Sequence, residues 1–202
     1  MTAGRTRLYM VRHAESPFIY GEERTRGLSD KGAAHAQELA EIFASIPVNL
    51  VISSPYTRAV DTVKPTAKSK GLEVALHEEL KERRIEGLDY RAEWEVLERA
   101  IQTSFEDLDY ALEGGESTRQ TQQRAIPIIE QILEEYSEKS IVLGTHGNIM
   151  VAIMNYYDSQ YGYEFWAGTS KPDIYLLEFE GNRLVQVERL WGISWVRQNK
   201  AL

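Results

Sequence analysis

Short strand-like runs alternate with helical patterns along this chain, and this alternation restricts the fold more than any other feature of the sequence. The strand-like runs lie at 8–12, 49–53, 72–77 and 140–144. The helical patterns, in which apolar residues recur with helical spacing, cover 30–44, 54–70, 117–136 and 149–156. Strands that alternate with helices are typical of a mainly parallel sheet covered on both faces. The sequence therefore predicts an α/β fold with three layers, α/β/α, around a mainly parallel central sheet.

Two more strands are expected later in the chain, at 173–180 and 183–190. The residues between them, Gly181-Asn182, form a two-residue hairpin signal, so an antiparallel hairpin should lie at one edge of the sheet. The 202 residues fit a single domain, 1–202. Residues 85–113 contain weakly amphipathic pieces among many charges, which indicates a lid-like insertion in that domain.

Two of the predicted helices have clear start signals. Ser54-Pro55 places a hydroxyl at the expected N-cap and a proline at the first helical position. Ser117 and Gln120 have the spacing of a capping box, in which each side chain accepts a hydrogen bond from the backbone of the other residue. We therefore expect helices to begin directly after Ser54 and directly after Ser117.

The composition excludes several classes of function. The chain has no cysteine, so disulfides, thiolate metal sites and cysteine nucleophiles are ruled out. A net charge of −8 argues against sequence-independent binding of nucleic acid, which needs a broad basic surface. No apolar run approaches the length of a membrane span, and the first residues lack the apolar core of a signal peptide. We expect a cytoplasmic protein without nucleic-acid or membrane partners.

The first strand ends in Arg12-His13, which is an unusual ending for a segment that serves packing alone. Open α/β sheets bind ligands just beyond the carboxyl ends of their strands. By itself the pair fits either a ligand site or an ordinary surface pair after an edge strand. The choice depends on later residues, because Arg58, Glu82 and His146 stand at equivalent junctions and should converge on the same rim of a parallel sheet.

Two histidines, two arginines and one carboxylate at one rim are a set that suits phosphoryl transfer. A neutral imidazole nitrogen can attack phosphorus and form a phosphohistidine, which divides hydrolysis into two easier steps. Arginine guanidinium groups match phosphate oxygens in bidentate geometry and keep their charge. A carboxylic acid can protonate the leaving oxygen and later accept a proton from water. These residue types therefore favour an enzyme that transfers phosphoryl groups.

The same residues lie in segments that resemble the histidine phosphatase superfamily, which includes the phosphoglycerate mutases. Residues 11–16, with the sequence VRHAES, resemble the Arg-His-Gly signature of this family. Ala14 stands where the signature has glycine, a small change that should keep the tight turn. Further resemblances follow in the family's order at 53–62, 80–83, 114–117 and 145–148. Together they span nearly the whole chain, and such an ordered match is far more specific than any single segment.

The resemblance implies a role for each residue that matches a family motif. His13 falls on the catalytic nucleophile, and Glu82 falls on the proton donor. The expected phosphate-binding residues are Arg12, Arg58, His146, Ser16 and Gly147. The resemblance further implies a small phosphorylated metabolite as the substrate, with no metal and no cofactor. It leaves the oligomeric state open, and a homodimer is one arrangement that fits.

Departures from the family's pattern bear on the choice between a phosphatase and a mutase. Ile19 stands where mutases commonly carry an asparagine, so one phosphate contact is lost or supplied elsewhere, for instance by Ser16. Residues 85–113 carry Arg91 and Arg99 among many acids, whereas the mutases have a longer, basic insertion. We therefore predict a metal-independent phosphomonoesterase that acts through a phosphohistidine. The alternatives are a phosphoglycerate mutase and a non-catalytic module of the same fold that binds a phosphorylated ligand or a partner.

Overall fold

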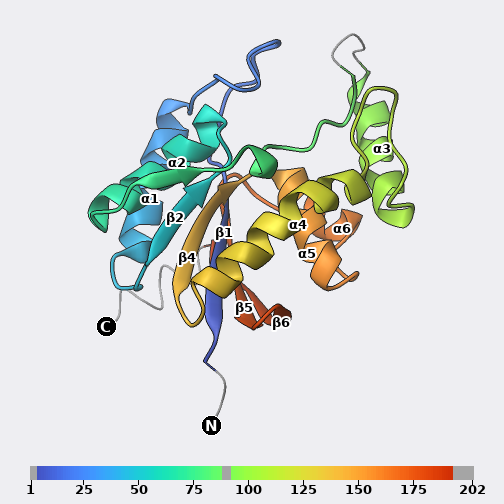
Figure 1. Cartoon of the computed structure of the whole chain (residues 1–202). Helices are drawn as coiled ribbons and strands as arrows, with labels where there is room; N and C mark the ends of the chain where they lie inside the picture. The colour runs from blue at the N-terminus through green and yellow to red at the C-terminus, as the bar shows by residue number, and fades with distance from the viewer. Residues whose placement is uncertain (1–3, 88–91, 193–202) are drawn as a thin grey trace.

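The computed structural model describes residues 4–87 and 92–192, and within them a six-stranded sheet lies between helices (Figure 1). The strands are β1 (Thr6–Arg12), β2 (Leu50–Ser53), β3 (Val74–Leu76), β4 (Ser140–Thr145), β5 (Asp173–Glu180) and β6 (Arg183–Arg189). The helices are α1 (Asp30–Phe43), α2 (Thr57–Ser69), the 3₁₀ turn η1 (Glu78–Leu80), α3 (Trp94–Glu106), α4 (Thr118–Glu135), α5 (Gly147–Tyr157) and α6 (Tyr163–Ala167). The predicted α/β fold class is confirmed.

The strand order is β3-β2-β4-β1-β5-β6, which places β1 in the interior of the sheet. β1 pairs in parallel with β4, and β2 pairs in parallel with both β3 and β4. β5 runs antiparallel to β1, and β6 runs antiparallel to β5, so the hairpin forms one edge of the sheet. Gly181 has a φ of 59° and supplies the left-handed conformation that the hairpin turn needs. The mainly parallel sheet and its antiparallel edge are both as predicted.

The side chains of β1 alternate between the two faces of the sheet, as strand geometry requires. Leu8 and Met10 belong to a hydrophobic cluster that includes residues of α4 and α5. Tyr9 and Val11 belong to a second cluster that includes residues of α1 and α2. All four side chains are buried. Because β1 is covered on both faces, its sequence stays apolar up to Arg12 instead of alternating with polar residues.

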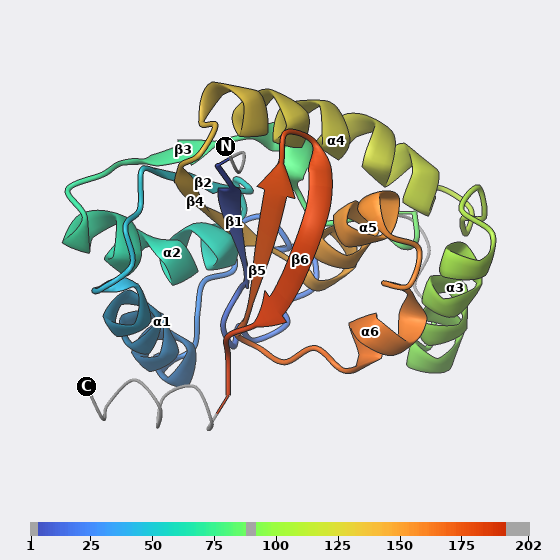
Figure 2. The same cartoon turned by 90° about the horizontal axis from the view of Figure 1, so that it is seen from below.

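Two layers of helices cover the opposite faces of the sheet (Figure 2). α1 and α2 pack on one face, and α4 and α5 pack on the other. α6 follows α5, and α3 lies farthest from the sheet on that side of the molecule. No helix among the described residues has the length and the apolar character that a membrane crossing requires.

The predicted insertion at 85–113 contains α3, which packs against α6. The rings of Trp94 and Trp166 are stacked there, with their centroids 6.5 Å apart and an angle of 30° between their planes. This aromatic contact joins the insertion to the part of the chain that follows α5. Arg91, one of the two arginines noted in the insertion, lies outside the described residues. The lid-like role of 85–113 stays a prediction.

The two predicted helix starts have different outcomes. Ser117 and Gln120 form the complete capping box of α4, with hydrogen bonds of 3.1 Å and 2.9 Å between side chain and backbone. The prediction that Ser54 is an N-cap is wrong, because α2 begins only at Thr57. The N-cap of α2 is Tyr56, and the fully buried hydroxyl of Ser54 lies against the ring of His146, a contact between distant segments.

Candidate active site

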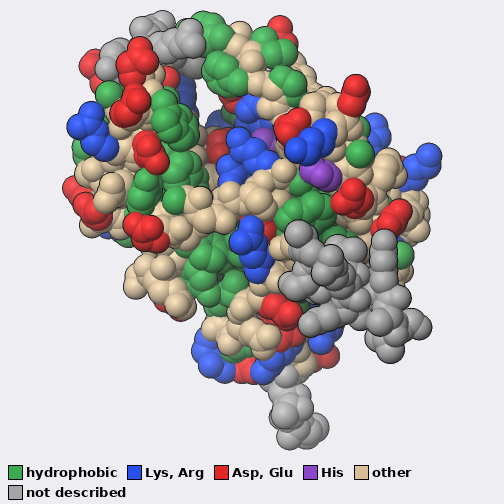
Figure 3. All heavy atoms as spheres, turned by 180° about the vertical axis from the view of Figure 1, so that it is seen from behind, with side chains coloured by type: hydrophobic (Ala, Val, Ile, Leu, Met, Phe, Trp, Pro, Cys, Tyr) green, Lys and Arg blue, Asp and Glu red, His purple; other side chains and the backbone are tan. Residues whose placement is uncertain are grey.

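β1 and β4 lie side by side, and a histidine follows the last residue of each strand. Arg12 is paired with Thr145 in the register of the two strands, and the amide of His13 donates to the Thr145 carbonyl over 2.9 Å. The rings of His13 and His146 are therefore neighbours, with their centroids 5.3 Å apart. Figure 3 shows a hollow in one face of the molecule, with basic side chains and a histidine gathered beside it.

His13 is buried, with 4% of its surface exposed, and both of its ring nitrogens have partners. Nδ1 lies 2.8 Å from the Ala14 carbonyl oxygen, which can only accept, so Nδ1 carries the proton. Nε2 accepts a hydrogen bond of 3.1 Å from Nε of Arg58. Burial, followed by the positive charge of Arg58, lowers the pKa of His13 from 6.5 to about 2. The ring is consequently neutral, and its lone pair is on Nε2.

Arg58 lies in the first turn of α2 and is almost completely buried. Besides the contact with His13, its Nη1 donates to the Glu23 backbone carbonyl, and its Nη2 lies 3.3 Å from the Glu23 carboxylate. The Arg58 carbonyl accepts from the hydroxyl of Thr62, which in turn accepts from the amide of Ala14. The start of α2 is thereby fixed to the loop after β1, so the guanidinium is held beside Nε2 of His13.

His146 is fully buried at the N-cap position of α5. Its Nε2 lies 2.8 Å from the hydroxyl oxygen of Ser54, and its Nδ1 is enclosed without a hydrogen-bond partner among the described residues. Burial, followed by the positive charge of Arg58, lowers the pKa of His146 well below its usual value. This second imidazole is therefore neutral as well, and one of its nitrogens remains available to a ligand.

Arg12 and Gly147 approach each other closely. A Cβ atom on Gly147 would lie only 2.9 Å from Cζ of Arg12, so glycine leaves the room that the guanidinium occupies. Nη1 of Arg12 donates to the carbonyl of Thr169 at 3.2 Å and also to its hydroxyl. Nε of Arg12 is buried and has no partner within the described part of the chain. The guanidinium is thus held at its tip, while one donor remains free.

The carboxylate of Glu82 meets the first turn of α5, directly beyond His146. Its Oε1 accepts from the amides of Ile149 at 2.9 Å and Arg83 at 2.8 Å, and its Oε2 accepts from the amide of Asn148 at 3.2 Å. A helix N-terminus offers free amides and a favourable dipole to such an anion. The carboxylate is placed at the same rim as the two histidines, as the sequence predicted.

Ser16 is one step removed from the histidines. Its hydroxyl donates to the Gly27 carbonyl at 2.7 Å and accepts from Nη1 of Arg26 at 2.7 Å. The Glu23 carboxylate connects Arg26 to Arg58, at 3.4 Å and 3.3 Å respectively. Of the residues expected to hold phosphate, Ser16 is therefore the one that reaches the site through another side chain.

Two cations close to the site, Arg26 and Lys171, were missed in the sequence. Burial and then the charge of Arg26 lower the pKa of Arg58. Burial and then the charges of Arg12 and Arg26 lower the pKa of Lys171. Lys171 precedes β5, whose amino end meets the carboxyl end of the antiparallel β1, and this topology could have identified it. Arg26 lies in a loop without period or motif, so no comparable signal points to it.

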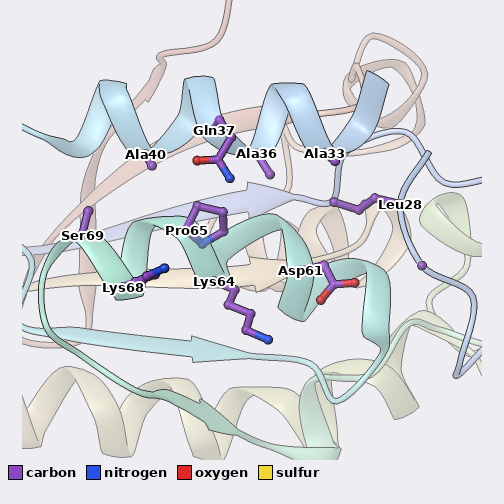
Figure 4. A pocket seen from close by; sticks show the side chains of 11 residues that line it. Leu28, Ala33, Ala36, Gln37, Ala40, Asp61, Lys64, Pro65, Lys68 and Ser69 are labelled. Atoms are coloured by element: carbon purple, nitrogen blue, oxygen red, sulfur yellow. The ribbon is translucent and has the colours of Figure 1, made fainter. Parts of the chain in front are cut away.

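A separate hollow of about 830 Å³ lies between α1 and α2 (Figure 4). Gln37 of α1 and Asp61, Lys64 and Lys68 of α2 are among the side chains that line it. None of the residues predicted to bind phosphate or to act in catalysis borders this groove. Volume alone therefore does not locate the chemistry, which we place at the ends of β1 and β4 because the titratable groups converge there.

Known proteins with similar sequences point to one family. The chain matches the model of the histidine phosphatase superfamily (branch 1) over residues 8–191. The glucosyl-3-phosphoglycerate phosphatase of Mycolicibacterium vanbaalenii is 27% identical over 162 residues, which cover 73% of this chain and 72% of the relative. The 2,3-bisphosphoglycerate-dependent phosphoglycerate mutase 2 of Gloeobacter violaceus is 30% identical over 162 residues, which cover 73% of each chain.

Among solved structures, the complex of a mycobacterial glucosyl-3-phosphoglycerate phosphatase with inorganic phosphate is similar, with a TM-score of 0.74 and 24% identity. The alignment covers 90% of this chain and 95% of that one. This likeness concerns the fold, whereas the family model also matches the sequence segments that carry the two histidines. The chain belongs to the histidine phosphatase superfamily, branch 1.

Proposed function

We propose that this protein is a metal-independent phosphomonoesterase that hydrolyses a small phosphorylated metabolite through a phosphohistidine at His13. The observation that carries the proposal is the state of the His13 ring, which is neutral, holds its proton on Nδ1 and keeps a lone pair on Nε2. A neutral nitrogen of this kind is a nucleophile toward phosphorus. The name of the Mycolicibacterium vanbaalenii relative, a phosphatase of a small phosphorylated metabolite, supports hydrolysis as the reaction.

In the first step, Nε2 of His13 attacks phosphorus. The N–P bond forms while the P–O ester bond breaks, and the electron pair of the broken bond leaves on the alcohol oxygen. Glu82 in its acid form gives that oxygen a proton, so a neutral alcohol departs. Oε1 of Glu82 already accepts two amides, whereas Oε2 accepts one at 3.2 Å, so Oε2 is the better placed of the two oxygens to deliver the proton.

In the second step, water attacks the phosphohistidine. Glu82, now a carboxylate, takes a proton from this water, the N–P bond breaks, and its electron pair returns to Nε2 of His13. Inorganic phosphate is released, and both residues regain their starting states. The N–H of Nδ1 stays with the Ala14 carbonyl throughout, which keeps the same nitrogen available for each turnover.

The phosphate needs positive charge and donors that are already in place. Arg12 and Arg58 supply two fixed charges, and the free Nε of Arg12 supplies a donor. His146 and the amide of Gly147, the first residue of α5, offer further donors to phosphate oxygens, since the next two amides of the helix donate to Glu82. Donors that are positioned before the reaction stabilise charge without a reorganisation cost. In this proposal Ser16 supports phosphate binding indirectly, because its hydroxyl holds the guanidinium of Arg26.

The phosphohistidine is tested by trapping. Wild-type protein and His13→Gln are mixed with a phosphomonoester labelled with ³²P and quenched within one turnover. We expect label that is stable to base and labile to acid in the wild type, located at His13 by mass spectrometry, and none in the variant. Label at another residue, or full turnover by His13→Gln, would contradict the proposal.

A mutase is the second candidate, because the Gloeobacter violaceus relative carries that name. The assay compares the release of phosphate from 3-phosphoglycerate with its isomerisation, with and without bisphosphoglycerate. We expect hydrolysis to dominate, since Ile19, which is 44% exposed, offers no hydrogen bond to a phosphate. Isomerisation that is faster than hydrolysis would replace the first candidate by the second.

A non-catalytic module is the third candidate. Such a module has no need of a nucleophile, yet His13 and Arg58 are both present and in contact. A lack of activity across a broad panel of phosphoesters would favour this candidate. The expected homodimer and the expected cytoplasmic location stay predictions.

A further inference from the structure

Ser54 is a buried residue just beyond β2 that the mechanism above does not use. Its hydroxyl oxygen lies 2.8 Å from Nε2 of His146 and accepts a hydrogen bond of 3.2 Å from the amide of Tyr56. The other ring nitrogen of His146, Nδ1, is enclosed and has no partner among the described residues. The His146 ring is in turn the neighbour of the His13 ring. A chain of polar groups therefore leads from the Tyr56 amide through Ser54 to the site of reaction.

The number of protons on these polar groups decides whether Ser54 or His146 donates the hydrogen bond between them. A neutral imidazole has one nitrogen that donates and one that accepts, and a serine hydroxyl has one proton. If Nε2 of His146 donated to Ser54, two groups would lack a partner. The hydroxyl proton of Ser54 would find no acceptor among the contacts described above, and the lone pair on Nδ1 of His146 would find no donor. If Ser54 donates to Nε2, only the N–H on Nδ1 still lacks a partner. Buried polar groups are normally paired, so the second arrangement is favoured.

We propose that Ser54 is a positioning residue, which holds His146 in the tautomer with its proton on Nδ1 and thereby presents an N–H donor to the substrate phosphate. This inference rests on the proposed function and adds a residue to it. The tautomer matters because a lone pair on Nδ1 would repel a phosphate oxygen, whereas an N–H group attracts it. His146 is fully buried among cations and therefore stays neutral, so a second proton on the ring does not supply the donor instead.

Ser53 provides a matched control within the same segment. It precedes Ser54, is equally buried, and its hydroxyl donates to the Gly144 carbonyl at 3.3 Å. Replacing either serine by alanine removes one buried hydroxyl of the same size. Only the change at Ser54 removes the partner of His146, so a loss of packing or of a buried hydrogen bond alone should appear in both variants.

The tautomer is measured directly by NMR of protein labelled with ¹⁵N-histidine. The chain has four histidines, so few ring signals need assignment, and a His146→Gln variant identifies the relevant one. We expect the proton on Nδ1 in the wild type and in Ser53→Ala, and a shift of the proton toward Nε2 in Ser54→Ala. Inorganic phosphate is the binding probe. Its affinity should fall about tenfold to hundredfold in Ser54→Ala, as expected for a lost hydrogen bond to a charged group.

Ser54→Thr keeps the hydroxyl and should restore both the tautomer and most of the phosphate affinity. A proton on Nε2 of His146 in the wild type would overturn the proposal, and this result does not depend on whether Ser54→Ala folds. A Ser54→Ala protein with the wild-type tautomer and the phosphate affinity of Ser53→Ala would overturn it too. The NMR signal does not depend on turnover, so a wild type with the expected tautomer but without phosphatase activity would contradict the proposed function alone.

Discussion

The ends of β1 and β4 are alike in sequence but hold their histidines in different ways. Both strands are buried, lie side by side in parallel, and lead directly into a histidine. At the end of β1, His13 gives the proton of Nδ1 to the backbone carbonyl of the next residue. At the end of β4, His146 meets a side-chain hydroxyl from the neighbouring strand β2 through Nε2. Opposite ring nitrogens thus face away from these two partners: Nε2 in His13, where Arg58 donates to it, and Nδ1 in His146, which has no partner among the described residues.

In the proposed mechanism, this difference gives two identical side chains complementary tasks. A histidine fixed at Nδ1 offers the lone pair of Nε2 and can attack an electrophile, whereas one fixed at Nε2 by a donor offers an N–H group and can hold an oxygen. Burial keeps both rings neutral, which both tasks require. The partner of the ring therefore decides the role of each histidine, and the ring itself does not.

Replacing the histidines one at a time tests whether they have different roles, and we expect the largest losses of activity here. His13→Gln removes the attacking nitrogen, and we expect kcat to fall by at least about 10⁴-fold. His146→Gln removes a donor to the phosphate, and kcat/KM should fall by about 10²–10³-fold. Steady-state kinetics with p-nitrophenyl phosphate measure both losses, with His35→Gln on α1 as the control. Equal losses for the two site variants would mean that the two rings share one role.

The stability of the protein as a function of pH tests whether both histidine rings stay unprotonated in the folded state. The folded state holds the pKa of each ring below the 6.5 of an unfolded chain, so only the unfolded state takes up these protons as the pH falls through that value. Stability should therefore decrease toward acid, by about 2 kcal/mol for each histidine between pH 7.5 and pH 5. Urea unfolding at several pH values measures this loss.

The histidine variants identify the source of that acid sensitivity. His13→Gln and His146→Gln should each remove about half of it, if the two rings contribute equally. A slope that persists in the double variant of His13 and His146 would contradict the assignment of this pH dependence to the two strand ends.

Gly147→Ala changes the β4 end and tests its contact with the β1 end. The added Cβ would lie 2.9 Å from the guanidinium of Arg12, which is the flexible end of a side chain and can move aside. We expect an intact fold and a loss of about tenfold in kcat/KM, because the phosphate loses a well-placed charge. Gly168→Ala, where a Cβ would make ordinary contacts at 3.5 Å, is the control. Unchanged kinetics in Gly147→Ala would show that Arg12 need not stay in place.

The convergence of His13 and His146 could be predicted because it follows from topology. Parallel strands place their carboxyl ends at one edge, so residues at equivalent junctions must meet, whatever the loops do. Ser54 could not be predicted in the same way. Its local sequence, a serine before a proline, is what an N-cap requires, and only the distant β4 decides that the hydroxyl serves His146 instead. Local signals do not contain that contact.

Other parts of the site depend on loop conformation. The contacts of Glu23 with Arg26 and Arg58 join a loop to α2, and no periodicity in the sequence reports the path of such a loop. α6 was also missed, since its five residues are too few for a helical period to appear. The sequence thus predicted the residues that stand at strand ends and missed those that depend on how a loop folds back.

The spacing of the sheet fixes the separation of the two histidine rings. Neighbouring strands lie about 4.8 Å apart in any β-sheet, and the ring centroids of His13 and His146 lie 5.3 Å apart, one directly after each strand. The loop at 17–29 and the insertion at 85–113 supply neither of these two strands. Exchange of these two segments, in evolution or by protein engineering, should therefore alter which metabolite is accepted while the dimensions of the reaction centre stay the same.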